Sequence, residues 1–342
     1  MAKAVKLADI AAKLDISVVT VSKALSGQKG VSEKLREEIV ALADEMGYVQ
    51  PSTARKLAQR RSHNIGVLIR EKYMDQYASF YWQMYQQATR IAGERGSFTL
   101  LEEISPRMEK ETILPRLILE AKVDGLLLIG DLEDTYRTVL AAQGIPIMYL
   151  DYADRGMDCD AVISDSYYGA ARMTDYLISM GHREIGFVGT VLSTPSITDR
   201  YLGYVKALME NGLSANPDWV IEDRNPAGDR IDAENYLKLP DRLPTAFLCN
   251  CDVAAGMLIR KLENAGIRVP EDVSVAGFDN FAYPGLCDVE ITTIDVNLTE
   301  MSGRAVNRLL DRLDDQPYSR GIHIIEGALI EKKSVKKISK KG

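Results

Sequence analysis

The chain has 342 residues, 46% of them hydrophobic and 27% charged, which is typical of a globular protein and long enough for two or three domains. No apolar run reaches the roughly 20 residues that span a bilayer, and the first residues lack the apolar core of a secretory signal. Four cysteines, Cys159, Cys249, Cys251 and Cys287, are too few for a disulfide framework. We therefore expect a reduced, cytoplasmic protein.

The net charge of −7 is unevenly distributed along the chain. Residues 1–61 hold 11 basic and 7 acidic residues, and residues 332–342 add six lysines and no acid. The remainder, 62–331, holds 25 basic and 42 acidic residues. A basic head on an acidic body favours an anionic partner for the head, although a chance surface imbalance explains the charge equally well.

The first sixty residues predict helices only. A first helix over 7–14 has apolar residues at helical spacing. Ser17 is placed to cap a second helix that ends at Leu25, and Ser32 to cap a third that ends before Gly47.

Two β-branched residues, Val18 and Val19, open the second helix and need a partner other than water. At about 100° per residue, the inward positions are Val21, Ala24 and Leu25, and the outward ones are Val19, Ser22, Lys23 and Ser26. Val18 lies on the flank, where it packs either against the first helix or against a bound partner.

From His63 onward, short apolar strands alternate with helices. The expected strands cover 65–69, 98–102, 125–130, 146–151, 161–165, 185–190, 219–223, 246–250, 273–278 and 291–296. This alternation is typical of parallel sheets covered on both faces, and ten strands are more than a single sheet usually contains. The fold class expected is therefore α/β: a small all-α head and a body of two lobes with doubly wound parallel sheets, which divide near Asp165.

Ligands of open parallel sheets bind beyond the carboxyl ends of the strands. The residues expected there are Asp131, Asp151, Asp165, Thr190, Asn250, Asp252, Asp279 and Asn280. Such carboxylates and amides suit a ligand with many hydroxyl groups. The aromatic residues that open the helix after the first strand would either cover a sugar ring or pack in the core, and they are Phe80, Tyr81, Trp82 and Tyr85.

The sequence offers little for catalysis. It contains no glycine-rich nucleotide loop, no HExxH and no GxSxG, and its three histidines are scattered. Cys249 and Cys251 lack a second pair of metal ligands, so we interpret them as small apolar side chains at a strand end. An enzyme would have to use carboxylates alone, and no pair is singled out. We predict a protein without catalytic activity, metal or cofactor.

Motifs in order along the chain resemble the LacI/GalR family of transcription regulators. VKLADIAAKLDISVVTVSKALSG, VSEKLREEIVALADEMGYV and TARKLA are similar to the family's DNA-binding head and hinge. DSYYGAARMTDYLISMGHREIGFVG, DRYLGY and GIRVPEDVSVAGFDN are similar to segments of its body. The resemblance covers residues 5 to about 334.

The resemblance implies a helix-turn-helix head at 1–50, a hinge helix and linker at 51–62, and a body similar to periplasmic sugar-binding proteins. It places 63–166 with 295–319 in an N-terminal lobe, and 167–294 with 320–334 in a C-terminal lobe. Residues 335–342 would form a disordered, lysine-rich tail. Because no leucine heptad follows, we expect a homodimer rather than a tetramer.

In this family the second helix enters the major groove of DNA. The head residues that the resemblance places against DNA are Ser17, Val18, Val19, Thr20, Ser22, Lys23 and Ser26. The two valines would contact thymine methyl groups, and Lys23 a guanine edge or a phosphate.

Residues 52–60 resemble the hinge helix, which folds when two copies meet on the operator. Leu57 would insert into a minor-groove step, with Ala54 and Arg55 beside it. Pro51 stands one place later than the usual proline of the family, which would change how the hinge helix begins.

The resemblance also implies an effector pocket between the lobes. Arg200 and Asp279 match the family's main effector-binding residues, and Asp165 matches an aspartate at the lobe crossover. Cys251 stands where the family has a ligand asparagine, and Asn250 would replace it if the strand end shifts by one residue. The expected effector site therefore comprises Phe80, Tyr81, Asp165, Arg200, Asn250, Cys251 and Asp279.

The expected function is repression of carbohydrate-use genes from a palindromic double-stranded operator. A saccharide effector would change the angle between the lobes, and with it the formation of the hinge helix. A nucleobase co-repressor is the alternative ligand. Two rival functions stay open: a sugar-binding module and a carbohydrate-active enzyme, each with a vestigial head.

Overall fold

A computed structural model describes residues 7–25, 30–46, 63–74, 80–153, 159–225, 231–281 and 285–338. Among the residues expected to bind DNA, Ser26, Ala54, Arg55 and Leu57 lie outside the described residues, as does the whole hinge segment with Pro51. The chain divides into two compact units, Met1–Ser62 and His63–Gly342.

The described part of the first unit contains the helices α1 (Leu7–Leu14), α2 (Val18–Leu25) and α3 (Glu33–Glu45). Ser17 Oγ accepts a hydrogen bond from Thr20 N at 3.1 Å, and Ser32 Oγ accepts one from Leu35 N at 3.4 Å, which confirms both expected caps. The apolar faces of the helices meet in a small core of Ile10, Ala11, Val21, Ala24, Ile39 and Ala43.

The N-terminal lobe of the second unit is built on a six-stranded parallel sheet in the order β11-β5-β4-β3-β1-β2. Its strands are β1 (Asn64–Arg70), β2 (Phe98–Ile104), β3 (Gly125–Ile129), β4 (Ile147–Leu150), β5 (Ala161–Ser164) and β11 (Ile322–Ile325). Its helical segments are η1 (Glu71–Tyr73), α5 (Phe80–Glu94), α6 (Pro106–Lys110), α7 (Arg116–Leu119), α8 (Asp134–Ala141) and α12 (Leu298–Leu313).

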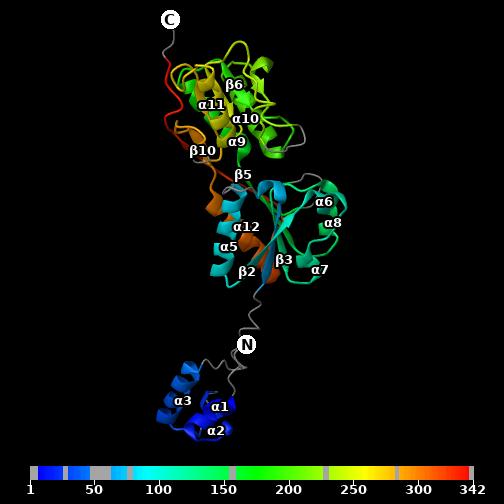
Figure 1. The fold of residues 1–342 in the computed structure, drawn as a ribbon, viewed down its shortest axis with the longest axis vertical. Helices are drawn as coiled ribbons and strands as arrows, with labels where there is room; N and C mark the ends of the chain where they lie inside the picture. Colours follow the sequence, from blue (N-terminus) through cyan, green and yellow to red (C-terminus); the bar gives the residue numbers. More distant parts are fainter. Residues whose placement is uncertain are drawn as a thin grey trace. The chain divides into compact units, whose positions relative to one another are not determined.

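Helices cover both faces of this sheet (Figure 1). Successive side chains of a strand point to opposite faces, and β3 shows the consequence. Leu127 and Ile129 join the core beneath α5 and α12, whereas Leu126 and Leu128 join the core beneath α8. This arrangement explains why β3 is apolar at every position.

The C-terminal lobe has a four-stranded parallel sheet in the order β7-β6-β8-β9. Its strands are β6 (Ile185–Val188), β7 (Val220–Ile221), β8 (Ala246–Cys249) and β9 (Ser274–Ala276). Its helical segments are α9 (Ser166–Ser179), α10 (Pro195–Glu210), η2 (Pro217–Trp219) and α11 (Asp252–Asn264).

The side chains of β8 divide between the two faces of this sheet. Ala246 and Leu248 pack under α9 and α10, and Phe247 packs under α11. The helices α9 and α10 lie unusually close, because a Cβ atom on Gly203 would stand 2.0 Å from the carbonyl oxygen of Tyr167. Across the described residues, no helix is long and apolar enough to cross a membrane.

The structure corrects the expected place of the C-terminal segment. Residues 320–334 were expected in the C-terminal lobe, but β11 pairs with β5 and completes the N-terminal sheet. The segment then forms β12 (Ala328–Ile330), which pairs with β10 (Thr293–Asp295) in a two-stranded antiparallel sheet that departs from the expected parallel arrangement. This pairing joins segments about 160 positions apart, and the local sequence pattern does not encode it.

The beginning of the expected tail is ordered by packing. The carbonyl of Ser334 accepts a hydrogen bond from Val275 N at 2.9 Å, and Val335 is buried. Lys336 N donates to Ser274 Oγ at 3.1 Å. Residues 335–338 therefore run along the edge of the C-terminal sheet instead of forming a disordered tail.

Candidate functional site

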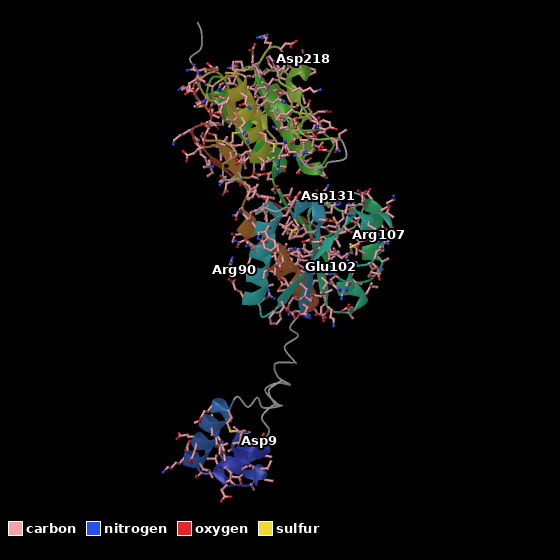
Figure 2. The ribbon with its side chains drawn as sticks, in the orientation of Figure 1. Asp9, Arg90, Glu102, Arg107, Asp131 and Asp218 are labelled. Atoms are coloured by element: carbon pink, nitrogen blue, oxygen red, sulfur yellow. The ribbon has the colours of Figure 1, made fainter. Side chains whose placement is uncertain are left out.

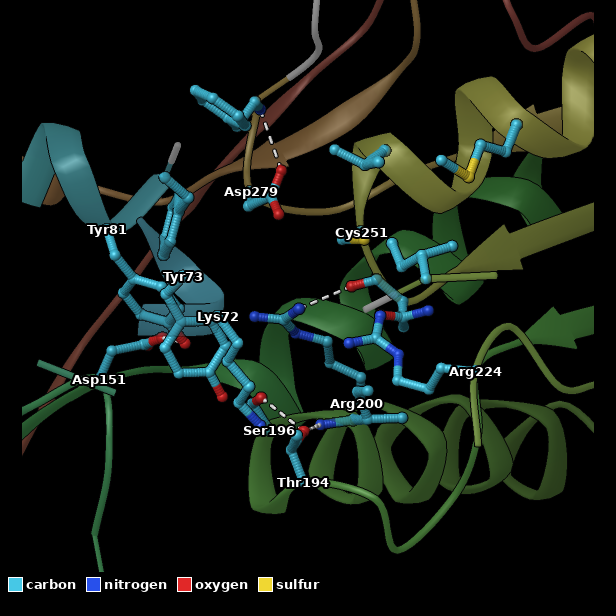
Figure 3. Close-up of a pocket in the computed structure, with 17 residues that line it drawn as sticks. Lys72, Tyr73, Tyr81, Asp151, Thr194, Ser196, Arg200, Arg224, Cys251 and Asp279 are labelled. Atoms are coloured by element: carbon cyan, nitrogen blue, oxygen red, sulfur yellow. Dashed lines mark hydrogen bonds between the residues drawn. The ribbon is translucent and has the colours of Figure 1, made fainter. Parts of the chain in front are cut away.

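A cavity of about 310 Å³ opens at the carboxyl ends of strands from both lobes (Figure 3). It is lined by Lys72, Tyr73, Phe80, Tyr81, Asp151, Thr194, Ser196, Ile197, Arg200, Arg224, Ile231, Asn250, Cys251, Val253, Met257, Asp279 and Phe281. Six of the seven residues expected in the effector site line it, and the exception is Asp165.

Arg200 is the buried cation of this cavity. It projects from α10, a helix that begins where the Thr194 side chain accepts a hydrogen bond from Ile197 N. Its Nη1 donates to the carbonyl of Asn250 at 2.6 Å, its Nε donates to Ser166 Oγ at 3.3 Å, and its guanidinium lies 3.9 Å from the Phe278 ring. These contacts fix the plane of the guanidinium while one edge faces the cavity.

Two carboxyl groups face Arg200 from different lobes, Asp151 at the end of β4 and Asp279 after β9. Burial raises the pKa of Asp279 to about 7 and the pKa of Asp151 to about 6, and the charge of Arg200 opposes both shifts. Both backbones have positive φ, 63° at Asp151 and 90° at Asp279. Burial thus brings both carboxyls closer to the neutral form, which can donate a hydrogen bond as well as accept one, and this suits a ligand with hydroxyl groups.

Asn250 does not offer its amide to the cavity in the expected way. Its Nδ2 donates to the Val188 carbonyl at 3.0 Å and to Asp223 Oδ2 at 2.8 Å. Asp223 is fully buried and also binds the guanidinium of Arg224, which lines the cavity. The hydrogen bonds of Arg224, together with those of Asn250, lower the pKa of Asp223, although burial alone would raise it. Asn250 thus helps to position Arg224 through their shared partner Asp223, and its amide nitrogen is not free to take the ligand-binding role expected at Cys251.

Cys251 lines the cavity and also caps α11, since its Sγ accepts a hydrogen bond from Ala254 N at 3.5 Å. Burial raises the pKa of Cys251 to about 12, so the group is a neutral thiol. Within the described residues, no group of histidine, cysteine and carboxylate side chains could hold a metal ion.

Aromatic side chains form the N-terminal wall of the cavity. The ring centroids of Tyr73 and Tyr81 are 4.6 Å apart, and those of Phe80 and Tyr81 are 5.6 Å apart. Tyr81 donates to Asp151 Oδ2 at 3.2 Å. The hydroxyl of Tyr73 donates to Asp131, which helps to hold this wall in place.

Next to Tyr73, an ion cluster around the buried side chain of Arg70 anchors Asp131. Arg70 donates to Glu109 at 2.7 Å, to Asp131 at 2.7 Å and to Glu133 at 2.6 Å. Figure 2 shows Asp131 at the end of the N-terminal lobe nearest the C-terminal lobe. Asp131 does not line the first cavity, but it lines a neighbouring one together with Tyr73, Tyr81 and Asp151.

Several residues singled out in the sequence lie elsewhere. Asp165 Oδ1 accepts a hydrogen bond from Tyr168 N at 3.0 Å and caps α9, so it does not face the cavity. Trp82 and Tyr85 lie next to each other, with centroids 5.2 Å apart, and neither lines the cavity. The remaining strand-end residues, Thr190, Asp252 and Asn280, bind other protein groups.

Other cavity residues were missed in the sequence. Arg224 follows a predicted strand by one residue, so reading that strand end would have found it. Thr194 and Ser196 flank Pro195 at the start of α10, a helix-start signal that was available. Lys72 and Tyr73 belong to the short turn η1, which had no periodic pattern to reveal it.

In the head, most of the expected DNA-contacting residues that the structure describes are exposed on α2 or next to it. Val18 is 45% exposed and Val19 63% exposed, whereas Val21 and Ala24 are buried. Ser17, Ser22 and Lys23 are also exposed, and Thr20 is half-buried. Val18 is therefore not buried against the first helix.

Two family models match the chain: "Bacterial regulatory proteins, lacI family" over residues 6–51, and "Periplasmic binding protein-like domain" over residues 174–335. Proteins named HTH-type transcriptional repressor PurR are similar along nearly the whole chain. The one from Pasteurella multocida (strain Pm70) is 27% identical over 96% of this chain and 98% of that protein. The one from Aliivibrio salmonicida (strain LFI1238) is 28% identical over the same shares.

Solved structures with this fold include the lac repressor dimer bound to operator and the anti-inducer ONPF, with a TM-score of 0.72 and 23% identity over 98% of this chain and 100% of that one. A complex of the transcriptional regulator CelR with cellobiose has a TM-score of 0.67 and 22% identity, over 96% of this chain and 99% of that one. These likenesses concern the fold.

Proposed function

We propose that the chain is a DNA-binding transcriptional repressor of the LacI family, and that it represses carbohydrate-use genes under the control of a saccharide bound between its lobes. The observation that carries the ligand class is the cavity itself. A fixed guanidinium, Arg200, lies between two carboxyl groups of raised pKa, Asp151 and Asp279, beside the hydroxyl of Tyr81. Alternating donors and acceptors of this kind match vicinal hydroxyl groups.

The head acts as the DNA reader in this proposal. The exposed pair Val18 and Val19 would contact thymine methyl groups in the major groove, with Lys23 at a guanine edge or a phosphate. A homodimer would place two such heads on the half-sites of a palindrome. The effector would act by favouring one angle between the lobes, a coupling of about 1–3 kcal/mol that must be reciprocal between ligand and DNA.

Selection of duplexes from a random DNA pool tests the DNA-binding part. A regulator enriches a palindrome with half-sites about one helical turn apart, with A·T pairs where the two valines dock. Binding of that duplex should weaken steeply with salt. A sugar-binding module with a vestigial head would enrich nothing, either alone or with any ligand that stabilises the body.

A thermal-unfolding screen of mono- and disaccharides against nucleobases then tests the ligand class. A nucleobase is the second candidate, because the aromatic residues Phe80 and Phe281 line the same cavity as the hydrogen-bonding groups Asp279 and Arg200. Stabilisation by a saccharide, with a change in operator affinity, supports the proposal. Stabilisation by nucleobases alone contradicts it.

A further inference from the structure

Two arginines that line the cavity share Asn250 as a partner. Arg200 projects from α10, and Arg224 lies in the segment that follows β7. Arg200 Nη1 donates to the backbone carbonyl of Asn250 at 2.6 Å, and Arg224 Nη2 lies 3.4 Å from Oδ1 of the same residue. The two guanidinium groups are therefore neighbours on the C-terminal wall. Figure 3 shows Arg224 on one side of the Arg200 guanidinium and Asp151 on the other.

Each guanidinium keeps one nitrogen for a ligand. Arg200 Nε and Nη1 donate to Ser166 and Asn250, and Arg224 Nε and Nη2 donate to Asp223. Among the described residues, Arg200 Nη2 and Arg224 Nη1 have no hydrogen-bond partner, and neither belongs to the nitrogens that are sealed from solvent. Both nitrogens can therefore be reached from the cavity.

The carboxylate that pairs with Arg224 does not line the cavity. Asp223 is fully buried and accepts hydrogen bonds from Arg224 Nη2 at 2.7 Å, Asn250 Nδ2 at 2.8 Å and Thr190 N at 2.9 Å. The pair thus presents its positive end to the cavity. Arg200 donates only to a hydroxyl and a backbone carbonyl among the described residues, so its charge has no carboxylate partner.

The other ionisable groups of the cavity do not cancel this positive charge. Lys72 lines the same cavity, with its Nζ 4.9 Å from the ring centroid of Tyr73. Burial and the nearby Asp279 raise the pKa of Cys251 to about 12, and the charge of Arg224 opposes this rise, so a neutral thiol lies near Arg224. Burial also raises the pKa values of Asp151 and Asp279, which weakens their negative charge. Three cationic side chains thus line the cavity against two carboxyls that burial shifts toward the neutral form.

An uncharged sugar would use only part of this arrangement. Its hydroxyl groups could accept hydrogen bonds from the free guanidinium nitrogens, but they would not balance the charge. A carboxylate or a phosphate offers at least two anionic oxygens, and its hydrogen bonds to guanidinium groups are roughly twice as strong as those of neutral acceptors. The partial burial of both arginines strengthens this attraction further.

We propose that the effector is a carbohydrate that carries an anionic group, a carboxylate or a phosphate, bound at Arg224 beside Arg200. Its hydroxyl groups then face Asp151 and Asp279. This inference rests on the proposed saccharide function. It narrows the ligand class from sugars in general to sugar acids and sugar phosphates.

Matched ligands test the inference on the unaltered protein. Glucose, galactose and mannose, each beside its uronate and its 6-phosphate, are titrated calorimetrically into the full-length chain at pH 7.5. In at least one series, an anionic member should bind at least about tenfold more tightly than the neutral sugar. This preference should shrink as the ionic strength rises from about 0.05 M to about 0.5 M. Uronates and phosphates tested side by side distinguish the two anionic groups.

Variants then assign the preference to Arg224. Arg224→Gln combined with Asp223→Asn removes both charges of the buried pair and keeps hydrogen-bonding amides in their place, and it should abolish most of the preference. Arg224→Lys keeps the charge without the planar fork and should retain part of it. The matched control is Arg242→Gln, because Arg242 is an arginine of the same lobe whose side chain is 74% exposed. This control should preserve the preference.

The outcomes separate the two proposals. Anionic members that bind no more tightly than the neutral sugar in every series, or a preference that survives the double variant, would overturn the inference and leave a saccharide effector in place. Failure of every carbohydrate to bind would overturn the saccharide function as well. Thermal unfolding of each variant without ligand shows that a lost preference does not come from a lost fold. The comparison of ligands on the unaltered protein decides the inference even where the double variant does not fold.

Discussion

Replacing Arg200 by methionine tests the central feature of the cavity. The side chain is 7% exposed and donates two hydrogen bonds to protein groups, so its guanidinium is held ready for a ligand. A hydrogen bond to a charged group contributes about 1.5–3 kcal/mol, and two such bonds to vicinal hydroxyls would contribute about 3–6 kcal/mol. Arg200→Met should therefore weaken effector binding by a factor of at least about 100.

The matched control is Arg200→Lys, which keeps the charge and loses the planar fork. We expect an intermediate loss, roughly tenfold, for this variant. Calorimetric titration with the saccharide found in the screen measures both affinities. Operator binding without effector should stay unchanged, because the head lies in a separate unit. Effector binding by Arg200→Met within threefold of the unaltered protein would refute the assignment of Arg200.

The same substitution has a pH signature. Arg200 opposes the rise in the pKa of both Asp151 and Asp279, so its removal should raise both values further. Because both carboxyls then hold their protons more tightly in the folded state than in the unfolded state, the free energy of unfolding falls further as the pH rises. Urea unfolding should show a larger loss of stability for Arg200→Met at pH 8 than at pH 5, and an equal loss at both would contradict this account.

Three further substitutions test separate features. The pKa of Asp151 is raised from 3.8 to about 6, so this carboxyl stabilises the fold below pH 4, and that contribution is lost as the pH rises through 6. Between pH 4 and pH 8, the free energy of unfolding of Asp151→Asn should therefore rise by up to about 3 kcal/mol relative to that of the unaltered protein. A difference in urea unfolding that does not depend on pH would contradict this. Gly203→Ala should cost about 1–3 kcal/mol in thermal unfolding because its Cβ would meet backbone, whereas Gly93→Ala, with no atom within 4 Å, should cost nothing. Val19→Ala should weaken operator binding about fivefold without changing the free energy of unfolding of the head. Replacement of the buried Val21 by alanine should instead lower that free energy by about 2 kcal/mol. The reverse pattern would place Val19 in the core.

Local patterns predicted the head and most strands of the body. Ser17 and Ser32 cap their helices as expected, because a cap depends on residues only three positions apart. The apolar strands were equally visible, since residues on both faces of a covered sheet are buried. Arg200 and Asp279 were placed by family resemblance, and the structure brings both to one cavity.

The errors concern interactions between residues far apart in the sequence. The pairing of β11 with β5 joins residues about 160 positions apart, and nothing in either segment specifies the other. Asn250 lines the cavity as expected, but its amide nitrogen donates to Asp223, a partner 27 positions away that the local pattern did not connect to it. Asp165 was predicted from its position at a strand end, where capping of the next helix is an equally good use for a carboxylate.

The late position of β11 affects how the chain folds during synthesis. The first five strands of the N-terminal sheet leave the ribosome well before Ile325 does, so the outer edge of β5 stays unpaired meanwhile. At 5–20 residues per second, the 161 residues from Ser164 to Ile325 take roughly 8–32 s. The C-terminal sheet, continuous in sequence from β6 to β9, can form within that interval. Nascent chains of this protein therefore expose a strand edge to neighbours, and their yield should depend on holding chaperones more strongly than refolding of the finished chain does.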